Sequence, residues 1–208
     1  ILVFSFSSGL LLSQTLEKFH YGLHATVGFP VGEFAGTIDN SLGGTAWGVG
    51  MNFMLNPKKA GFYSPVMIGL EGNYMHLGRD KTSETRFLPP LKTTFNYFNV
   101  GPLIRVFLND REEGFVPFLD GCVGIKVLNT LTQVDNSLLD TILDQENLES
   151  LLSTNYEGLG YGLGLGFYKR KVNPNPEIKR GTFYMRLIYQ YGDRINYVER
   201  GSITVDSK

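Results

Sequence analysis

Apolar and polar residues alternate with a period of two along much of the chain. From Phe19 to Val31 every odd position is apolar, and the even positions carry His, Gly, His, Thr, Gly and Pro. A strand places successive side chains on opposite faces, whereas a helix would spread such a pattern around its whole circumference. This segment is therefore predicted to be a strand with one apolar face.

The same alternation returns in further segments, which lie at 47–55, 66–76, 98–108, 115–127, 159–167 and 183–191. Together with 19–31 they predict seven strands of about 9 to 13 residues, and a tilted membrane-spanning strand needs roughly 9 to 11. The expected connections alternate in length: 32–46, 78–94 and 128–156 are long, and 56–62 and 109–114 are short and polar. Long outer loops and short periplasmic turns are typical of outer-membrane barrels.

The face opposite the apolar one is rich in glycine and carries a few charged residues. Glycine at every second position from Gly158 to Gly166 indicates a wall where other side chains crowd against bare backbone, as inside a narrow barrel. We therefore interpret the apolar face as lipid-facing and the mixed face as the interior; a soluble sandwich or lipocalin-like barrel is the alternative. The predicted interior charge cluster comprises Glu71, Arg105, Asp120, Lys126, Glu157 and Arg186. Buried charges need partners, so these are expected to pair and to fill the lumen.

Composition excludes several other classes of protein. Lys and Arg number 19 against 20 Asp and Glu, so no basic surface for nucleic acid is expected. No run after the N-terminus reaches the roughly 18 apolar residues of a spanning helix. The single cysteine, Cys122, excludes an intrachain disulfide and a CxxC metal site.

The two ends of the chain suggest processing and an unfinished barrel. Residues 1–13, ILVFSFSSGLLLS, are uncharged and are interpreted as the remnant of a signal peptide, with a short hydrophobic strand or helix as the alternative. Residues 14–208 then form the outer-membrane barrel domain. Because bacterial single-chain barrels have an even number of strands, either an eighth strand follows residue 208 or the count of seven is wrong by one. The fold class is thus all-β, an antiparallel up-and-down transmembrane β-barrel whose last strand is missing.

Three stretches, YGLHATVGFPVG, FVPFLDGCVGIKV and GLGYGLGLGF, resemble the small eight-stranded outer-membrane barrels of the OmpA transmembrane domain and OmpX type, and the exported barrel proteins common in Bacteroidota. The resemblance runs from about Phe19 to Tyr191. It implies a signal peptide, an interior closed by charge pairs, and a role in anchoring, adhesion or complex assembly. The missing final strand departs from the family pattern.

No catalytic, cofactor-binding or metal site is expected. Leu163 and Leu165 stand where a GxGxxG loop would need glycine, and no GxSxG nucleophile elbow occurs. His20 and His24 share a strand face but lie roughly 13 Å apart at about 3.3 Å per residue, too far to hold one ion. They are expected to be interior histidines bonded to neighbouring polar groups.

The long segment 128–156 carries apolar residues at helical spacing beside acidic ones. Its candidate partner-binding residues are Leu138, Leu139, Ile142, Leu143, Asp144 and Leu148. A short helix that caps the barrel's own mouth is preferred to a partner surface. The expected protein is a non-enzymatic structural or interaction barrel of the bacterial outer membrane, in contact with lipid and with envelope proteins through its loops. A small pore is the alternative, and a lipid-modifying enzyme is the less favoured third class.

Overall fold

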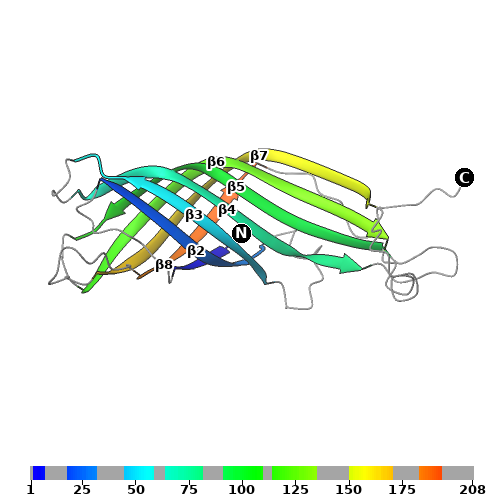
Figure 1. The fold of residues 1–208 in the computed structure, drawn as a ribbon, viewed down its shortest axis with the longest axis horizontal. Helices are drawn as coiled ribbons and strands as arrows, with labels where there is room; N and C mark the ends of the chain where they lie inside the picture. Colours follow the sequence, from blue (N-terminus) through cyan, green and yellow to red (C-terminus); the bar gives the residue numbers. More distant parts are fainter. Residues whose placement is uncertain are drawn as a thin grey trace, which may run out of the picture.

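A computed structural model describes residues 2–7, 18–31, 45–58, 64–81, 91–109, 114–134, 150–170 and 183–193. Their regular elements are strands: β1 Leu2–Ser7, β2 Phe19–Phe29, β3 Ala46–Leu55, β4 Val66–Lys81, β5 Leu91–Phe107, β6 Gly114–Val134, β7 Ser150–Arg170 and β8 Phe183–Gly192. Each strand pairs antiparallel with its neighbours in sequence, and the sheet closes into a barrel (Figure 1). The predicted all-β, up-and-down barrel is confirmed. Within these ranges no helix is long and apolar enough to cross a membrane.

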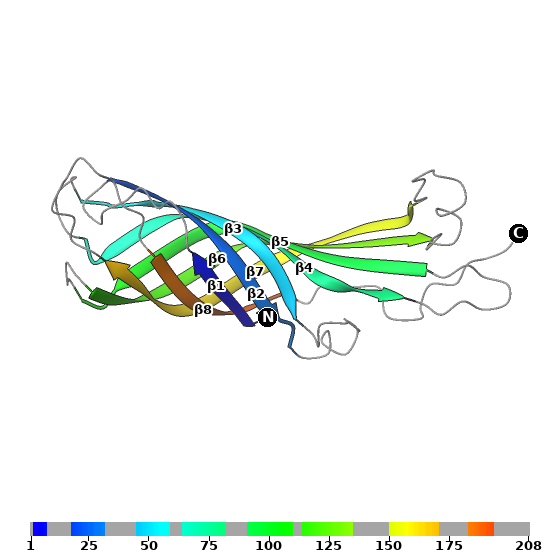
Figure 2. The same cartoon turned by 60° about the horizontal axis from the view of Figure 1, so that its bottom comes forward.

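The strand that closes the barrel is β1, so the expected count of seven strands is wrong by one. β1 pairs with β2 on one side and with β8 on the other, so that Leu2 lies opposite both Phe29 and Tyr189 (Figure 2). The eighth strand thus comes from the N-terminal segment and not from a segment beyond residue 208, because the open edges of β2 and β8 need hydrogen-bond partners. The assignment of residues 1–13 to a signal peptide stays a prediction. That prediction and the closure of the barrel by β1 are mutually exclusive, because a signal peptide is removed and a removed segment cannot be part of the mature wall.

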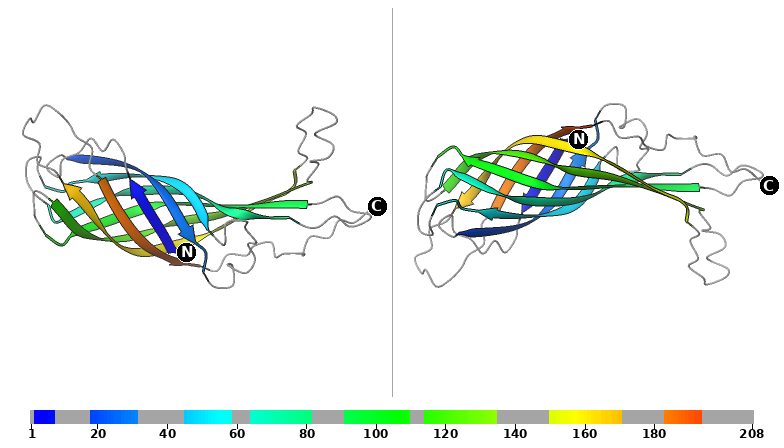
Figure 3. Two further views of the ribbon diagram at one scale, coloured as in Figure 1. Left: turned by 90° about the horizontal axis from the view of Figure 1, so that it is seen from below. Right: turned by 90° about the horizontal axis from the view of Figure 1, so that it is seen from above.

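Four neighbouring strands are much longer than the rest. β4, β5, β6 and β7 have 16, 17, 21 and 21 residues, whereas β2, β3 and β8 have 11, 10 and 10. Their extra length lies at one end, where they continue past the other strands (Figures 1 and 3). We call residues 77–81, 91–97, 127–134 and 150–158 the projecting sheet, and this end of the barrel the projecting end.

The projecting sheet corrects two of the expected loops. Residues 78–81 and 91–94 belong to β4 and β5, and residues 128–134 and 150–156 belong to β6 and β7, so both connections are shorter than predicted. Strand pairing continues here because Thr and other β-formers still favour an extended backbone after the apolar alternation has ended. Residues 135–149, with the predicted amphipathic helix and its six candidate partner-binding residues, lie outside the described residues.

The predicted alternation of faces is confirmed along the wall. Apolar residues at alternate positions point away from the lumen and are exposed; they include Leu23, Trp47, Met51, Leu70, Val100, Ile125, Leu163 and Leu165. The intervening positions point inward, and most of their large side chains are buried. The barrel is therefore apolar on its outer surface and mixed inside, the reverse of a soluble barrel that stores an apolar ligand.

The inward-facing glycines of β7 make room for side chains from neighbouring strands, as expected. A Cβ atom built on Gly166 would lie 2.5 Å from Phe118 Cζ and 2.8 Å from Arg186 Cβ, and one on Gly164 would lie 2.7 Å from Ile188 Cγ1. By contrast, a Cβ on the outward-facing Gly121 meets nothing within 4 Å. The interior is packed so closely that the inward face of β7 has room only for glycine at these positions.

We therefore expect Gly166→Val to lower the free energy of unfolding by about 1–3 kcal/mol, because overpacking displaces neighbouring side chains. The matched control, Gly121→Val, adds the same atoms on the open outer face and should leave stability unchanged. Urea titration of the refolded barrel in detergent, followed by heat-modifiable migration, measures both. Equal stability of the two variants would contradict the crowded interior.

Candidate functional site

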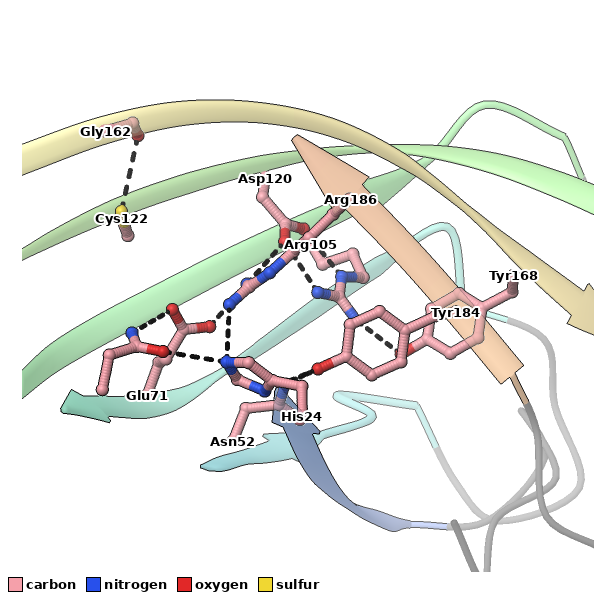
Figure 4. A network of polar contacts seen from close by, with 11 residues as sticks. His24, Asn52, Glu71, Arg105, Asp120, Cys122, Gly162, Tyr168, Tyr184 and Arg186 are labelled. Carbon is pink, nitrogen blue, oxygen red and sulfur yellow. Dashed lines mark hydrogen bonds and ion pairs between the residues drawn. The ribbon is translucent and has the colours of Figure 1, made fainter. Parts of the chain in front are cut away.

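The barrel interior holds four buried charged side chains, contributed by four strands. Glu71 on β4, Arg105 on β5, Asp120 on β6 and Arg186 on β8 all point inward and meet near the middle of the lumen (Figure 4). All are at most 5% exposed. Two carboxylates face two guanidinium groups, so the cluster is electrically balanced. These four of the six predicted interior charges are brought together by the fold.

Arg105 and Asp120 lie directly opposite each other on β5 and β6 and form the most regular pair. Arg105 Nε donates to Asp120 Oδ1 at 2.7 Å, and Nη2 donates to Oδ2 at 2.6 Å. Two parallel bonds of this kind fix the orientation of both groups. Arg105 Nη1 also donates to the hydroxyl of Tyr168, and its Cζ lies 4.1 Å from the centroid of the Phe118 ring. The guanidinium is thus enclosed by a carboxylate and aromatic rings.

Arg186 joins this pair to the other acid across the lumen. Its Nη1 lies 2.5 Å from Glu71 Oε2 and 3.1 Å from Asp120 Oδ2. One guanidinium therefore bridges β4, β6 and β8, strands that are not neighbours in the wall. Such a bridge holds opposite sides of the barrel together.

A chain of neutral hydrogen bonds extends the cluster to β2 and β3. Asn52 Nδ2 donates to the Tyr184 hydroxyl at 3.0 Å, and this hydroxyl lies 2.8 Å from His24 Nδ1. His24 Nε2 lies 2.8 Å from Asn73 Oδ1, and Asn73 Nδ2 donates to Glu71 Oε1 at 2.7 Å. Every bond of this chain runs from a donor to an acceptor when His24 is neutral with its proton on Nε2, so we assign that tautomer from the network; Arg186 Nη2, 3.3 Å from the same nitrogen, then gains no bond from His24.

Apolar side chains close the lumen on both sides of this polar layer. At the projecting end they are Ala46, Met75, Leu77, Phe95, Tyr97 and Leu128. At the opposite end they are Met54, Met67, Leu103, Phe107, Val116, Phe118 and Tyr184. An eight-stranded barrel is just wide enough for side chains to fill. The interior is thus built as three layers, apolar, polar and apolar.

Two of the predicted interior charges lie elsewhere. Lys126 is on the inward face but near the projecting end, where its Nζ donates to Asp193 O at 2.5 Å. The prediction for Glu157 is wrong: this residue is exposed and lies on the outer face of β7, like Leu159 two positions later. Glu157 and Leu159 both have odd numbers, so the period of two already places these two residues on the same face of β7.

Sequence reasoning missed several neutral members of the network. They are Asn52, Asn73, Tyr168 and Tyr184. Each lies an even number of residues from other inward-facing positions on its strand, and this spacing is the signal that could have identified them. His20 and His24 are both buried, as expected, and His24 is bonded within the network. Among the described residues no group of three His, Cys, Asp or Glu side chains is arranged to hold a metal ion.

Comparison with known proteins adds no relative from which a role could be transferred. No protein family, no curated protein and no solved structure matches the chain. The chemistry of the site therefore has to be read from its own geometry. Every charge of the central layer meets an opposite charge, an arrangement suited to holding strands together.

We expect Arg105→Ala to lower the free energy of unfolding by about 3–5 kcal/mol, because Asp120 loses its bidentate partner inside the barrel. Asp120→Ala should cost a similar amount, and the double variant should cost clearly less than the sum of the two. The control Lys169→Ala removes an exposed cation that lies 5.7 Å from the Phe115 ring and should change stability by at most about 1 kcal/mol. Urea titration gives all four values. Additive losses for Arg105 and Asp120 would contradict the pairing.

Proposed function

We propose that this protein is an integral outer-membrane β-barrel with a side-chain-filled lumen, and that it acts through contacts made at its projecting end. The observation that carries the proposal is the inversion of the barrel: charged residues are buried and paired inside, and large apolar residues cover the outer wall. A soluble protein rarely exposes an apolar surface of this extent. In a bilayer the same surface is the one that lipid would cover.

The dimensions of the apolar wall fit a bilayer. Along β5 and at the residue that follows it, the outward positions from Phe98 to Leu108 are apolar throughout. These ten steps of about 3.3 Å, tilted by about 40°, give a height of about 25 Å, the usual height of the apolar band of outer-membrane barrels. On β7 the exposed Glu157 and Lys169 bracket the band from Leu159 to Phe167. The resemblance to small outer-membrane barrels supports the same location.

A contact role fits the interior and the projecting sheet better than the alternatives do. A pore needs an open lumen, but the three interior layers fill it with side chains. A lipid-modifying enzyme needs a nucleophile and a base together at the rim of the wall. A structural or interaction protein needs a stable wall and a surface outside the bilayer, and the projecting sheet supplies such a surface.

The projecting sheet also offers backbone groups to a partner. Asp193 N donates to Leu159 O at 2.9 Å, while Leu159 N donates to the Asp193 carboxylate at 3.0 Å. The side chain of Asp193 thus takes the place of the next backbone acceptor at the end of β8. In the described part of the chain, no strand continues along the edge of β7 from Gly158 back to Ser150. An edge of this kind can add a strand from another chain.

To test the function, residues 135–149 between β6 and β7 are replaced by a short turn, or by a Gly/Ser segment of the same length as the matched control for loop length. Both variants should still fractionate with the outer membrane and migrate heat-modifiably, because the barrel is unchanged. Proteins that co-purify with the native chain in mild detergent should be lost from both variants.

Two results would contradict the proposal at different points. Unchanged co-purifying proteins in both variants would remove the role of the segment around Leu138 to Leu148. Recovery of the folded native chain in the soluble periplasm would refute the membrane location itself.

A further inference from the structure

A polar row crosses the outer face of four strands where the apolar wall ends. His76, Asn96, Asn129 and Asn155 lie directly opposite one another on β4, β5, β6 and β7. Asn129 Nδ2 donates to Asn155 Oδ1 at 2.7 Å, and His76 Nδ1 lies 3.1 Å from Asn96 Oδ1. The next outward residue toward the opposite end of β5 is the apolar Phe98. The row therefore marks a boundary on the wall.

Aromatic rings lie at this boundary: Trp47 on β3 is directly opposite His76, and Tyr74 and Phe98 on β4 and β5 are the next outward residues on the apolar side. The rings of Trp47 and His76 have centroids 5.8 Å apart, and those of Tyr74 and Phe98 are 4.9 Å apart. The Tyr74 hydroxyl donates to Asn96 Oδ1 at 3.0 Å, so its ring faces the wall while its polar tip reaches the row. Amphipathic rings of this kind are enriched where hydrocarbon meets headgroups.

Two basic side chains lie on the other side of the row. Arg79 is exposed and lies opposite Thr94, and Lys92 is two residues from Thr94 on the same face of β5. Diagonal neighbours of this kind are about 7–8 Å apart. In the part of the chain that the structure describes, neither residue has an ion-pair partner. The exposed acid Glu157 is on β7, three strands away from β4. Among the side chains that the structure describes, this corner of the rim is therefore basic.

We propose that Trp47, His76, Arg79, Lys92 and Asn96, here called the rim patch, bind the phosphorylated sugar headgroup of a membrane glycolipid. Guanidinium and ammonium groups pair with phosphate, and basic clusters beside membrane segments recognise lipid headgroups in this way. The amide of Asn96 and the indole of Trp47 are suited to sugar hydroxyls and to the apolar face of a sugar ring.

The occupant is a lipid because the rim patch is continuous with the apolar wall. Acyl chains attached to a headgroup at Arg79 and Lys92 would run past Asn96 along Phe98 and Val100, which are 45% and 58% exposed. A soluble sugar phosphate would leave this surface uncovered. The inference rests on the proposed membrane location, and it adds a class of lipid that the barrel selects.

The test is native mass spectrometry of the full barrel in mild detergent, titrated with bisphosphorylated lipid A or with the same lipid after removal of its phosphates. The native chain should bind the phosphorylated lipid at least tenfold more tightly. The double variant Arg79→Gln, Lys92→Gln should lose this preference. The control Lys169→Gln, which removes a cation on the same outer face at the opposite end of the wall, should keep it.

Three outcomes would overturn the inference: equal binding of both lipids by the native chain, an undiminished preference in the double variant, or displacement of the lipid by soluble glucosamine phosphate at equal concentration. Fractionation of the same proteins separates this inference from the proposed function. A barrel that resides in the outer membrane without lipid preference refutes only the rim patch, whereas a soluble native chain refutes the location.

Discussion

The structure depends on the pairing of charges that the barrel has removed from water. Arg105 and Arg186 are almost completely buried, and a buried guanidinium without a carboxylate would cost several kcal/mol. Asp120 forms ion pairs with both arginines, and Glu71 forms an ion pair with Arg186. Arg105 and Asp120 can pair within the β5–β6 hairpin, but Arg186 on β8 reaches Glu71 and Asp120 only when the sheet has curled round in one register. Charge pairing thus selects the closed barrel over a slipped or open sheet, because a one-residue slip would turn each of these charges to the outer face.

Other features of the barrel follow from this central layer. The two guanidinium groups occupy the middle of a narrow lumen, and the apolar layers on either side keep water away from them. Bare backbone at Gly164 and Gly166 leaves space for Ile188 and Phe118. With its buried charges paired inside, the wall can present an almost wholly apolar outer surface. The projecting sheet continues beyond that surface and carries a polar outer row, so the interior stabilises the fold and the proposed contacts are made at the projecting end.

Much of this architecture could be predicted from the sequence, because a strand with one apolar face has a period of two. That pattern located β2 to β8 and the inward positions of Glu71, Arg105, Asp120 and Arg186. It failed beyond the apolar wall, because the outer face there is polar, as at Asn96 and Asn129, while the inward face carries Phe95 and Leu128, so a search for strands with an apolar outer face stops short of these strand ends. It did not identify β1, because a short uncharged apolar run is also typical of a signal peptide. Cross-strand partners such as His24 and Tyr184 depend on register and closure, which a single sequence does not encode locally.

The measurement that tests the filled lumen most directly is the electrical conductance of the intact protein in a planar lipid bilayer. With paired charges between two apolar layers, the native chain should produce no large steady current steps. The Gly121→Val variant, altered only on the outer face, should be equally silent and controls for insertion of a mutated wall. Steady porin-like conductance from the intact native barrel would contradict the account and would favour a small pore.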